Sequence, residues 1–176
     1  MSTASELRPL PHTGAVAGHL LTASRLVASP WISLWIANGR FGLASFALAL
    51  AMATDLLDGP LVRRFGQATR AGAWFDSCTD LTLVAGAFAG CAVAGVLPWW
   101  PLWAIGASFA VFAATTSSRF HDPLGRCIGG LLMVAALGVL LVPDLTAQLA
   151  LGTMAGIACG LTIVARLASV ADSSPG

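Results

Sequence analysis

Residues 41–97 read FGLASFALALAMATDLLDGPLVRRFGQATRAGAWFDSCTDLTLVAGAFAGCAVAGVL, and this stretch decides the fold. Two long apolar runs flank a short segment that contains several arginines, and four aspartates lie where the runs meet that segment. The whole chain has eight acidic residues, so half of them lie here. A charged side chain well inside a bilayer costs roughly 2.5–3.5 kcal/mol, so four acids together require a compensating cation or a chemical task.

The composition excludes several classes of protein. Of the 176 residues 57% are hydrophobic and 10% are charged, and the mean hydropathy is +0.82. Soluble domains carry about 25% charged residues, so this composition indicates a membrane protein. The net charge of +1 argues against a nucleic-acid partner, which requires a dense basic face. We expect no signal peptide, because residues 1–16 are polar and contain prolines.

Apolar runs along the chain predict an all-α, polytopic membrane bundle of about six transmembrane helices. Polar or proline-containing breaks separate the runs, and Gly59-Pro60 is expected to end or bend the second helix. The predicted spans cover residues 19–37, 41–57, 73–97, 99–117, 127–142 and 144–166. The predicted organisation is a polar N-terminal segment (1–18), one six-helix catalytic domain in the membrane (19–168) and a short C-terminal tail (169–176).

The distribution of arginine predicts the orientation of the bundle. The chain has no lysine, and with six spans only Arg40 falls on one side of the membrane. The other side holds Arg8, Arg25, Arg63, Arg64, Arg70, Arg119, Arg126 and Arg166. The positive-inside rule therefore places both termini and the aspartates on the cytoplasmic side.

The four aspartates are spaced so that their carboxylates can converge. Asp55 and Asp58 lie one helical turn apart at the end of the second span, and Asp76 and Asp80 share a face at the start of the third. Gathered carboxylates suit hard cations such as Mg²⁺ or Mn²⁺, which bind a few carboxylates together with substrate phosphates. Gly59 and Gly72, on either side of the connecting segment, would let backbone approach a phosphate or nucleotide closely.

The segment reads Asp55-Leu-Leu-Asp58-Gly59-Pro-Leu-Val62-Arg63, then eight residues, then Gly72-Ala-Trp-Phe-Asp76-Ser-Cys-Thr-Asp80. It closely resembles the motif of the CDP-alcohol phosphotransferase family, Asp-x-x-Asp-Gly-x-x-Ala-Arg, eight residues, Gly-x-x-x-Asp-x-x-x-Asp. Val62 replaces the usual alanine and slightly alters the helix contact or the nucleotide pocket. A weaker resemblance lies in the first span, where His19-Leu-Leu-Thr22-Ala-Ser-Arg25 is similar to the family pattern Asn-x-x-Thr-x-x-Arg.

The resemblance implies an enzyme that binds a CDP-linked donor at the membrane surface, moves its phosphoryl-bearing half to an alcohol and releases CMP. By position, Asp55, Asp58, Asp76 and Asp80 would hold divalent metal, Mg²⁺ or Mn²⁺ and two ions in all, and Asp80 would be the catalytic base. The nucleotide-binding residues implied in the same way are Thr22, Asp55, Gly59, Arg63 and Gly72. For Thr22 and Arg25, ordinary packing and interface roles are the alternative.

The acceptor is the least determined substrate. Arg119 and Arg126 are candidates for binding a phosphorylated acceptor, and anchoring the topology is an equal alternative for both. We favour CDP-diacylglycerol as donor and a small polar alcohol as acceptor, in phospholipid synthesis. The alternative is a CDP-alcohol that donates its phospho-alcohol to a lipid hydroxyl. A divalent-cation transporter and a non-catalytic membrane scaffold are the rivals from other classes. Family members are commonly homodimers, so a homodimer among membrane lipids is expected.

Overall fold

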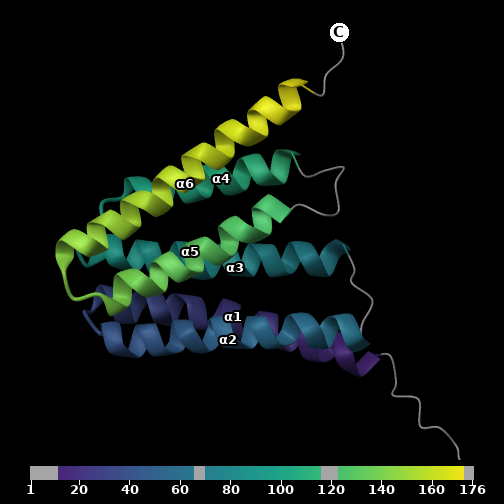
Figure 1. The fold of residues 1–176 in the computed structure, drawn as a ribbon. Helices are drawn as coiled ribbons and strands as arrows, with labels where there is room; N and C mark the ends of the chain where they lie inside the picture. The colour runs from purple at the N-terminus through teal and green to yellow at the C-terminus, as the bar shows by residue number, and fades with distance from the viewer. Residues whose placement is uncertain (1–11, 66–69, 116–122, 173–176) are drawn as a thin grey trace, which may run out of the picture.

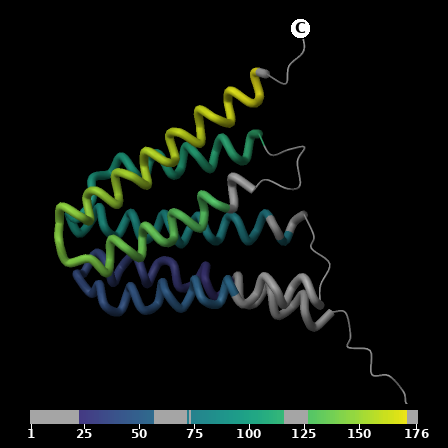
Figure 2. The backbone as a smooth tube through the Cα atoms, viewed as in Figure 1, coloured from purple at the N-terminus to yellow at the C-terminus, as the bar shows by residue number. Residues whose placement is uncertain are grey.

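The computed structural model describes residues 12–65, 70–115 and 123–172 (Figure 1), and it describes side chains for residues 23–56, 72, 74–115 and 127–171 (Figure 2). Within these ranges all regular structure is helical, and there is no strand. The helices are α1 (His12–Ala37), α2 (Phe41–Phe65), α3 (Arg70–Val93), α4 (Trp100–Thr115), α5 (Pro123–Leu141) and α6 (Leu145–Asp172). The predicted all-α class with six helices is therefore confirmed.

Several helices are longer than the apolar runs that predicted them. α1 begins at His12 rather than near residue 19, and α6 continues to Asp172. The expected end of the second helix at Gly59-Pro60 is wrong, because α2 continues through both residues to Phe65. A proline removes one helical hydrogen bond but can be accommodated where neighbouring groups satisfy the freed carbonyl. Hydropathy marks the apolar part of a helix, and polar turns can extend it beyond the membrane.

The outer surface of the bundle is apolar, as expected for helices surrounded by lipid. Phe46, Met154 and Leu161 are between 66% and 71% exposed, and many other large apolar side chains also point outward. By length and composition, one described helical stretch, Leu145–Ala171, could cross a membrane by itself. Shorter apolar helical stretches are Phe41–Leu56, Trp100–Thr115 and Cys127–Leu141. Helices that are apolar on all sides are typical of membrane bundles, where the core and the lipid are equally dry.

The helices run back and forth between two ends of the bundle, and each helix packs against neighbours distant in sequence (Figure 1). α1 packs most extensively against α3 and also against α2, whereas α4 packs against α6. α5 contacts α2, α3 and α6 and so joins the two groups. The buried core includes Ile32, Leu48, Leu83, Val139 and Cys159, one from each helix except α4. Because the helices alternate in direction, the start of α3 lies at the same end as the end of α2.

Small residues bring α1 and α3 into close contact. A Cβ atom added to Gly90 of α3 would lie 2.7 Å from the Ser33 carbonyl oxygen and 2.9 Å from the Ile36 Cβ atom of α1. One turn earlier, a Cβ atom on Gly86 would meet the Ser29 Oγ atom at 2.8 Å. The Ser29 hydroxyl donates a 2.8 Å hydrogen bond to the Thr82 carbonyl oxygen, which fixes the register of the two helices. Glycine at such positions allows the dense backbone packing on which membrane helices depend.

The close contact predicts opposite effects for two glycine-to-alanine changes. Gly90→Ala should lower the melting temperature of the detergent-solubilised protein, because overpacking costs about 1–3 kcal/mol. Gly106→Ala in α4 is the matched control, since its Cβ atom would meet nothing within 4 Å. That change should leave stability unchanged or raise it by up to about 1 kcal/mol through the better helix propensity of alanine. Equal melting temperatures for the two variants would contradict the proposed contact.

Candidate active site

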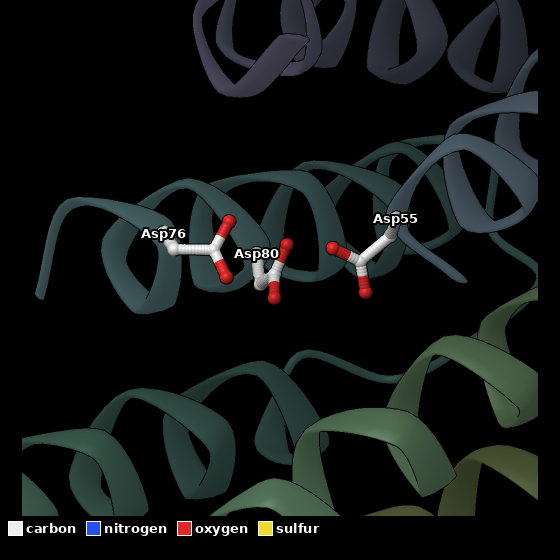
Figure 3. Close-up of side chains that lie close together, drawn as sticks. All are labelled: Asp55, Asp76 and Asp80. Carbon is white, nitrogen blue, oxygen red and sulfur yellow. The ribbon is translucent and has the colours of Figure 1, made fainter. Parts of the chain in front are cut away.

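Three of the four aspartates converge at one end of the bundle. Figure 3 shows Asp76 and Asp80 of α3 beside Asp55 of α2, with Asp80 between the other two. One carboxylate oxygen from each residue can be chosen so that all three atoms lie within 4.8 Å of one another. The side chains of Asp55, Asp76 and Asp80 are 35%, 46% and 27% exposed, so the cluster is open on one side. We call these residues the Asp triad.

Helix geometry explains how the Asp triad forms. Asp76 and Asp80 are four residues apart in α3 and therefore share one face of that helix. Asp55 lies in the last part of α2, which ends where α3 begins, so the antiparallel arrangement places it opposite that face. The expected convergence is thus found for these three carboxylates. The side chain of Asp58 lies outside the described set, so its place in the cluster stays a prediction.

A buried arginine completes the site. The side chain of Arg25, from α1, is 4% exposed, and its Nη1 atom lies 2.8 Å from Asp55 Oδ1 and donates a 2.8 Å hydrogen bond to Asp80 Oδ1. Its Nη2 atom donates to Asp76 Oδ1 at 3.3 Å. One guanidinium therefore contacts carboxylates from two other helices. Sequence reasoning considered Arg25 for the nucleotide site or for packing, and did not predict this contact.

A signal for the contact did exist in the sequence. Arg25 lies inside an apolar predicted span and remains charged at any working pH. A charge within a span almost always faces the bundle interior and pairs with an opposite charge. Because the acids outside the four-aspartate segment are Glu6, Asp122, Asp144 and Asp172, that segment held the nearest acidic partners along the packed helices.

The Asp triad fits a divalent cation. Carboxylate oxygens are the preferred ligands of Mg²⁺ and Mn²⁺. Oxygens on opposite sides of one such ion lie about 4–5 Å apart for bond lengths of about 2.0–2.5 Å, which matches the observed spread. The three carboxylates and Arg25 together carry a formal charge of −2, since three negative charges meet one positive charge. The site therefore retains the charge that a divalent cation would neutralise.

Most of the other predicted site residues cannot be compared with the Asp triad. Gly72 lies one turn before Asp76 in α3 and is half-buried. Arg119 lies outside the described residues. The backbones of the remaining residues are described within helices, but their side chains are not, and these are Thr22 of α1, Gly59 and Arg63 of α2, and Arg126 of α5. Their roles stay predictions.

A second buried arginine lies at the same end of the bundle. Arg166 of α6 is 8% exposed, and its guanidinium lies 5.0 Å from the centre of the Phe112 ring. Its Nη1 atom donates a 3.3 Å hydrogen bond to the Thr115 hydroxyl of α4. The Phe112 ring also packs against Trp74 of α3, with 5.9 Å between ring centres. Sequence analysis counted Arg166 only for topology, and the structure shows that it joins α6 to α4.

Comparisons with known proteins agree with the geometry. Residues 16–165 match the family described as CDP-alcohol phosphatidyltransferase. A protein of Mycobacterium tuberculosis named "Probable phosphatidylglycerophosphate synthase" is 36% identical over 104 residues, which cover 51% of this chain and 50% of that protein. A Drosophila melanogaster protein named "Probable cardiolipin synthase (CMP-forming)" is 39% identical over 83 residues, which cover 47% of this chain and 26% of that protein. The matches thus span about half the length of the mycobacterial relative. No solved structure matches the chain.

The Asp triad predicts a measurable metal affinity. Asp55→Asn and Asp76→Asn should each weaken Mn²⁺ binding by about 10-fold or more, because each removes a negative charge and an oxygen ligand. Mn²⁺ binding to purified protein in detergent can be followed by electron paramagnetic resonance. The matched control is Asp144→Asn, since Asp144 lies before α6 and its Oδ2 atom accepts a 2.9 Å hydrogen bond from the Ala147 amide. Unchanged affinity in the two triad variants would exclude the Asp triad as the metal site.

Proposed function

Because this chain belongs to the CDP-alcohol phosphatidyltransferase family, we propose that it transfers a phosphatidyl group from CDP-diacylglycerol to a small polar alcohol and releases CMP. The observation that carries the proposal is the convergence of Asp55, Asp76 and Asp80, which come from the motif that the family shares. The membrane bundle supports a lipid-linked donor, since the Asp triad lies at one end of helices with apolar outer surfaces.

The names of the relatives guide the choice of acceptor. The mycobacterial relative is named for the synthesis of phosphatidylglycerophosphate, so glycerol 3-phosphate is the first acceptor to test. The fly relative is named for the synthesis of cardiolipin with formation of CMP, so phosphatidylglycerol is the second. Both names describe products with a phosphatidyl group, which supports CDP-diacylglycerol rather than a CDP-alcohol as donor. Arg119 and Arg126 are proposed to bind the phosphate of a phosphorylated acceptor, because arginine forms paired hydrogen bonds with phosphate.

The reaction requires neutralised phosphate charge, an aligned hydroxyl and a proton acceptor. Divalent cations held by Asp55, Asp58, Asp76 and Asp80 would supply the neutralisation. Asp80 is proposed as the base, since it lies between the other two carboxylates and is the least exposed of the three. The acceptor oxygen forms a bond to the phosphatidyl phosphorus, the bond to the bridging diphosphate oxygen breaks, and CMP leaves with that oxygen. Asp80 takes the proton of the acceptor hydroxyl.

The nucleotide would lie beside the motif glycines. Gly59 and Gly72 would let the cytidine and diphosphate approach the backbone closely, and Thr22, Asp55 and Arg63 complete the proposed nucleotide-binding set. We further propose that this end of the bundle and both termini face the cytoplasm, because eight of the nine arginines lie on that side of the predicted topology. A homodimer is proposed as the assembly.

The function predicts metal-dependent release of CMP. Purified protein in detergent with CDP-diacylglycerol, Mg²⁺ or Mn²⁺ and glycerol 3-phosphate should release CMP, and removal of metal by a chelator should stop the release. Phosphatidylglycerol, serine, inositol and inositol phosphate complete the acceptor panel. Asp80→Asn should reduce turnover by about 100-fold or more, since general base catalysis contributes about 10²–10⁴-fold. Asp144→Asn should retain turnover.

The same variants separate binding from chemistry. Asp80→Asn should largely retain donor binding, whereas Asp55→Asn should weaken the metal-dependent binding of CDP-diacylglycerol. Full turnover by Asp80→Asn would reject its role as base. If folded protein bound the donor but used none of the acceptors, another acceptor would have to be sought. If it bound no cytidine nucleotide at all, the transporter and scaffold alternatives would return.

The proposed acceptor site makes a prediction about charge. Arg126→Gln should raise the KM for glycerol 3-phosphate by about 10-fold, since a hydrogen bond to a charged group contributes about 1.5–3 kcal/mol. The KM for an uncharged acceptor should not change, and Arg40→Gln at the opposite end of the bundle is the matched control. Parallel changes in both KM values would indicate that Arg126 acts on topology or folding instead.

A further inference from the structure

Arg25 occupies the centre of the Asp triad in the metal-free protein. Its Nη1 atom contacts the Oδ1 atoms of both Asp55 and Asp80 at 2.8 Å, and its Nη2 atom contacts Asp76 Oδ1 at 3.3 Å. The side chain is 4% exposed, so it has been removed from water and depends on these acids for its solvation. Each of the three carboxylates in turn has Arg25 as a positive partner close enough to offset their mutual repulsion.

The backbone of Arg25 is held in place by the α1–α3 contact. Arg25 lies one turn before Ser29 in α1, and the Ser29 hydroxyl donates to the Thr82 carbonyl oxygen of α3. Gly86 of α3 has no side chain, and this lets α1 approach to the distance at which a Cβ atom would meet Ser29. The guanidinium therefore enters the Asp triad from a fixed point, and its side-chain torsions are the remaining freedom.

We propose that Arg25 is a positioning residue that keeps the Asp triad assembled without metal and competes with a divalent cation for the same carboxylate oxygens. The inference rests on the proposed function in one respect, namely that the Asp triad is the metal site. A divalent cation bound to Asp55 Oδ1 and Asp80 Oδ1 would lie next to Nη1, and like charges at that distance repel strongly. Loading of the site therefore requires the Nη1 contacts to lengthen or break.

This competition has a consequence for the order of assembly. Without Arg25 three carboxylates at this distance would repel one another, and the triad would open between metal-binding events. With Arg25 the ligands stay gathered, but part of the binding free energy of the metal is used to displace the guanidinium. The chain would thus exchange metal affinity for a preformed site.

The first test is thermal stability with and without metal. Arg25→Gln removes the charge and keeps a hydrogen-bonding side chain of similar length. In chelator its melting temperature should fall by roughly 5 °C or more, because the carboxylates lose their buried partner. Saturating Mn²⁺ should then raise its melting temperature more than that of the wild type, since the metal replaces the missing cation. An equal Mn²⁺ effect in both proteins would overturn the proposal.

The second test is Mn²⁺ affinity by electron paramagnetic resonance, which requires no turnover. Arg25→Gln should bind Mn²⁺ about 5-fold more tightly or better, which is the size of a typical coupling between two sites. Arg25→Lys keeps the charge but loses the planar fork, so its affinity should lie between the two. Weaker or unchanged binding in Arg25→Gln would show that Arg25 does not compete, and would overturn the proposal.

A matched control separates this effect from the loss of any buried arginine. Arg166→Gln removes the other buried arginine at the same end of the bundle, whose guanidinium contacts Thr115 and Phe112. It should lower the melting temperature equally in chelator and in Mn²⁺ and leave Mn²⁺ affinity within about 2-fold, because exposed charges beyond about 10 Å are screened. If Arg25→Gln did not fold in either condition, the Arg25→Lys comparison would decide the matter by the same criteria.

The outcome also distinguishes this inference from the proposed function. If Asp55→Asn weakened Mn²⁺ binding but Arg25→Gln did not strengthen it, the metal site would stand and the role of Arg25 would be rejected. If neither the wild type nor Arg25→Gln bound Mn²⁺, the metal site and the competition would both be rejected. CMP release that persisted in chelator would reject the metal-dependent mechanism while leaving the stability result for Arg25 to be judged separately.

Discussion

A guanidinium surrounded by three carboxylates is the interaction on which the described end of the bundle depends. Arg25 reaches from α1 to Asp55 of α2 and to Asp76 and Asp80 of α3, so one side chain joins three helices. Such contacts are stronger in a membrane protein than at a water-exposed surface, because a low dielectric screens charge poorly. The same property makes each charge costly without its partners. The site and the packing of α1, α2 and α3 are therefore one problem in electrostatics.

The rest of the fold serves this arrangement by holding α1 against α3. Gly86 and Gly90 remove side chains from the contact, and the hydrogen bond from Ser29 to Thr82 sets the register. With lipid outside, burial of apolar surface does not hold membrane helices together, so close packing and polar contacts do. Around Arg166 the same logic recurs with an aromatic ring and a hydroxyl group in place of carboxylates. The two buried arginines connect α1 with its neighbours and α6 with α4 at the same end of the bundle.

Much of the fold could be predicted from the amino-acid sequence, because hydropathy and helix length are local properties. Six apolar runs predicted six helices, and the expected breaks near Gly39, Pro98 and Pro143 separate helices in the structure. The break at Pro60 was wrong, since a proline alone does not reveal whether its surroundings satisfy the freed carbonyl. The early start of α1 and the late end of α6 were missed for a related reason. Those turns are polar, and only the helix they extend explains them.

By itself the sequence determined the spacing of the aspartates, the family motif and the number of helices, since each is written in consecutive residues. It could place Asp76 and Asp80 on one face, because a helix has a fixed repeat. Only the tertiary structure decided that Arg25 would enter the Asp triad. That contact joins positions 51 to 55 residues apart along the chain for Asp76 and Asp80. It depends on how closely α1 approaches α3, and helix-to-helix distance arises from the packing of many side chains at once rather than from any local pattern.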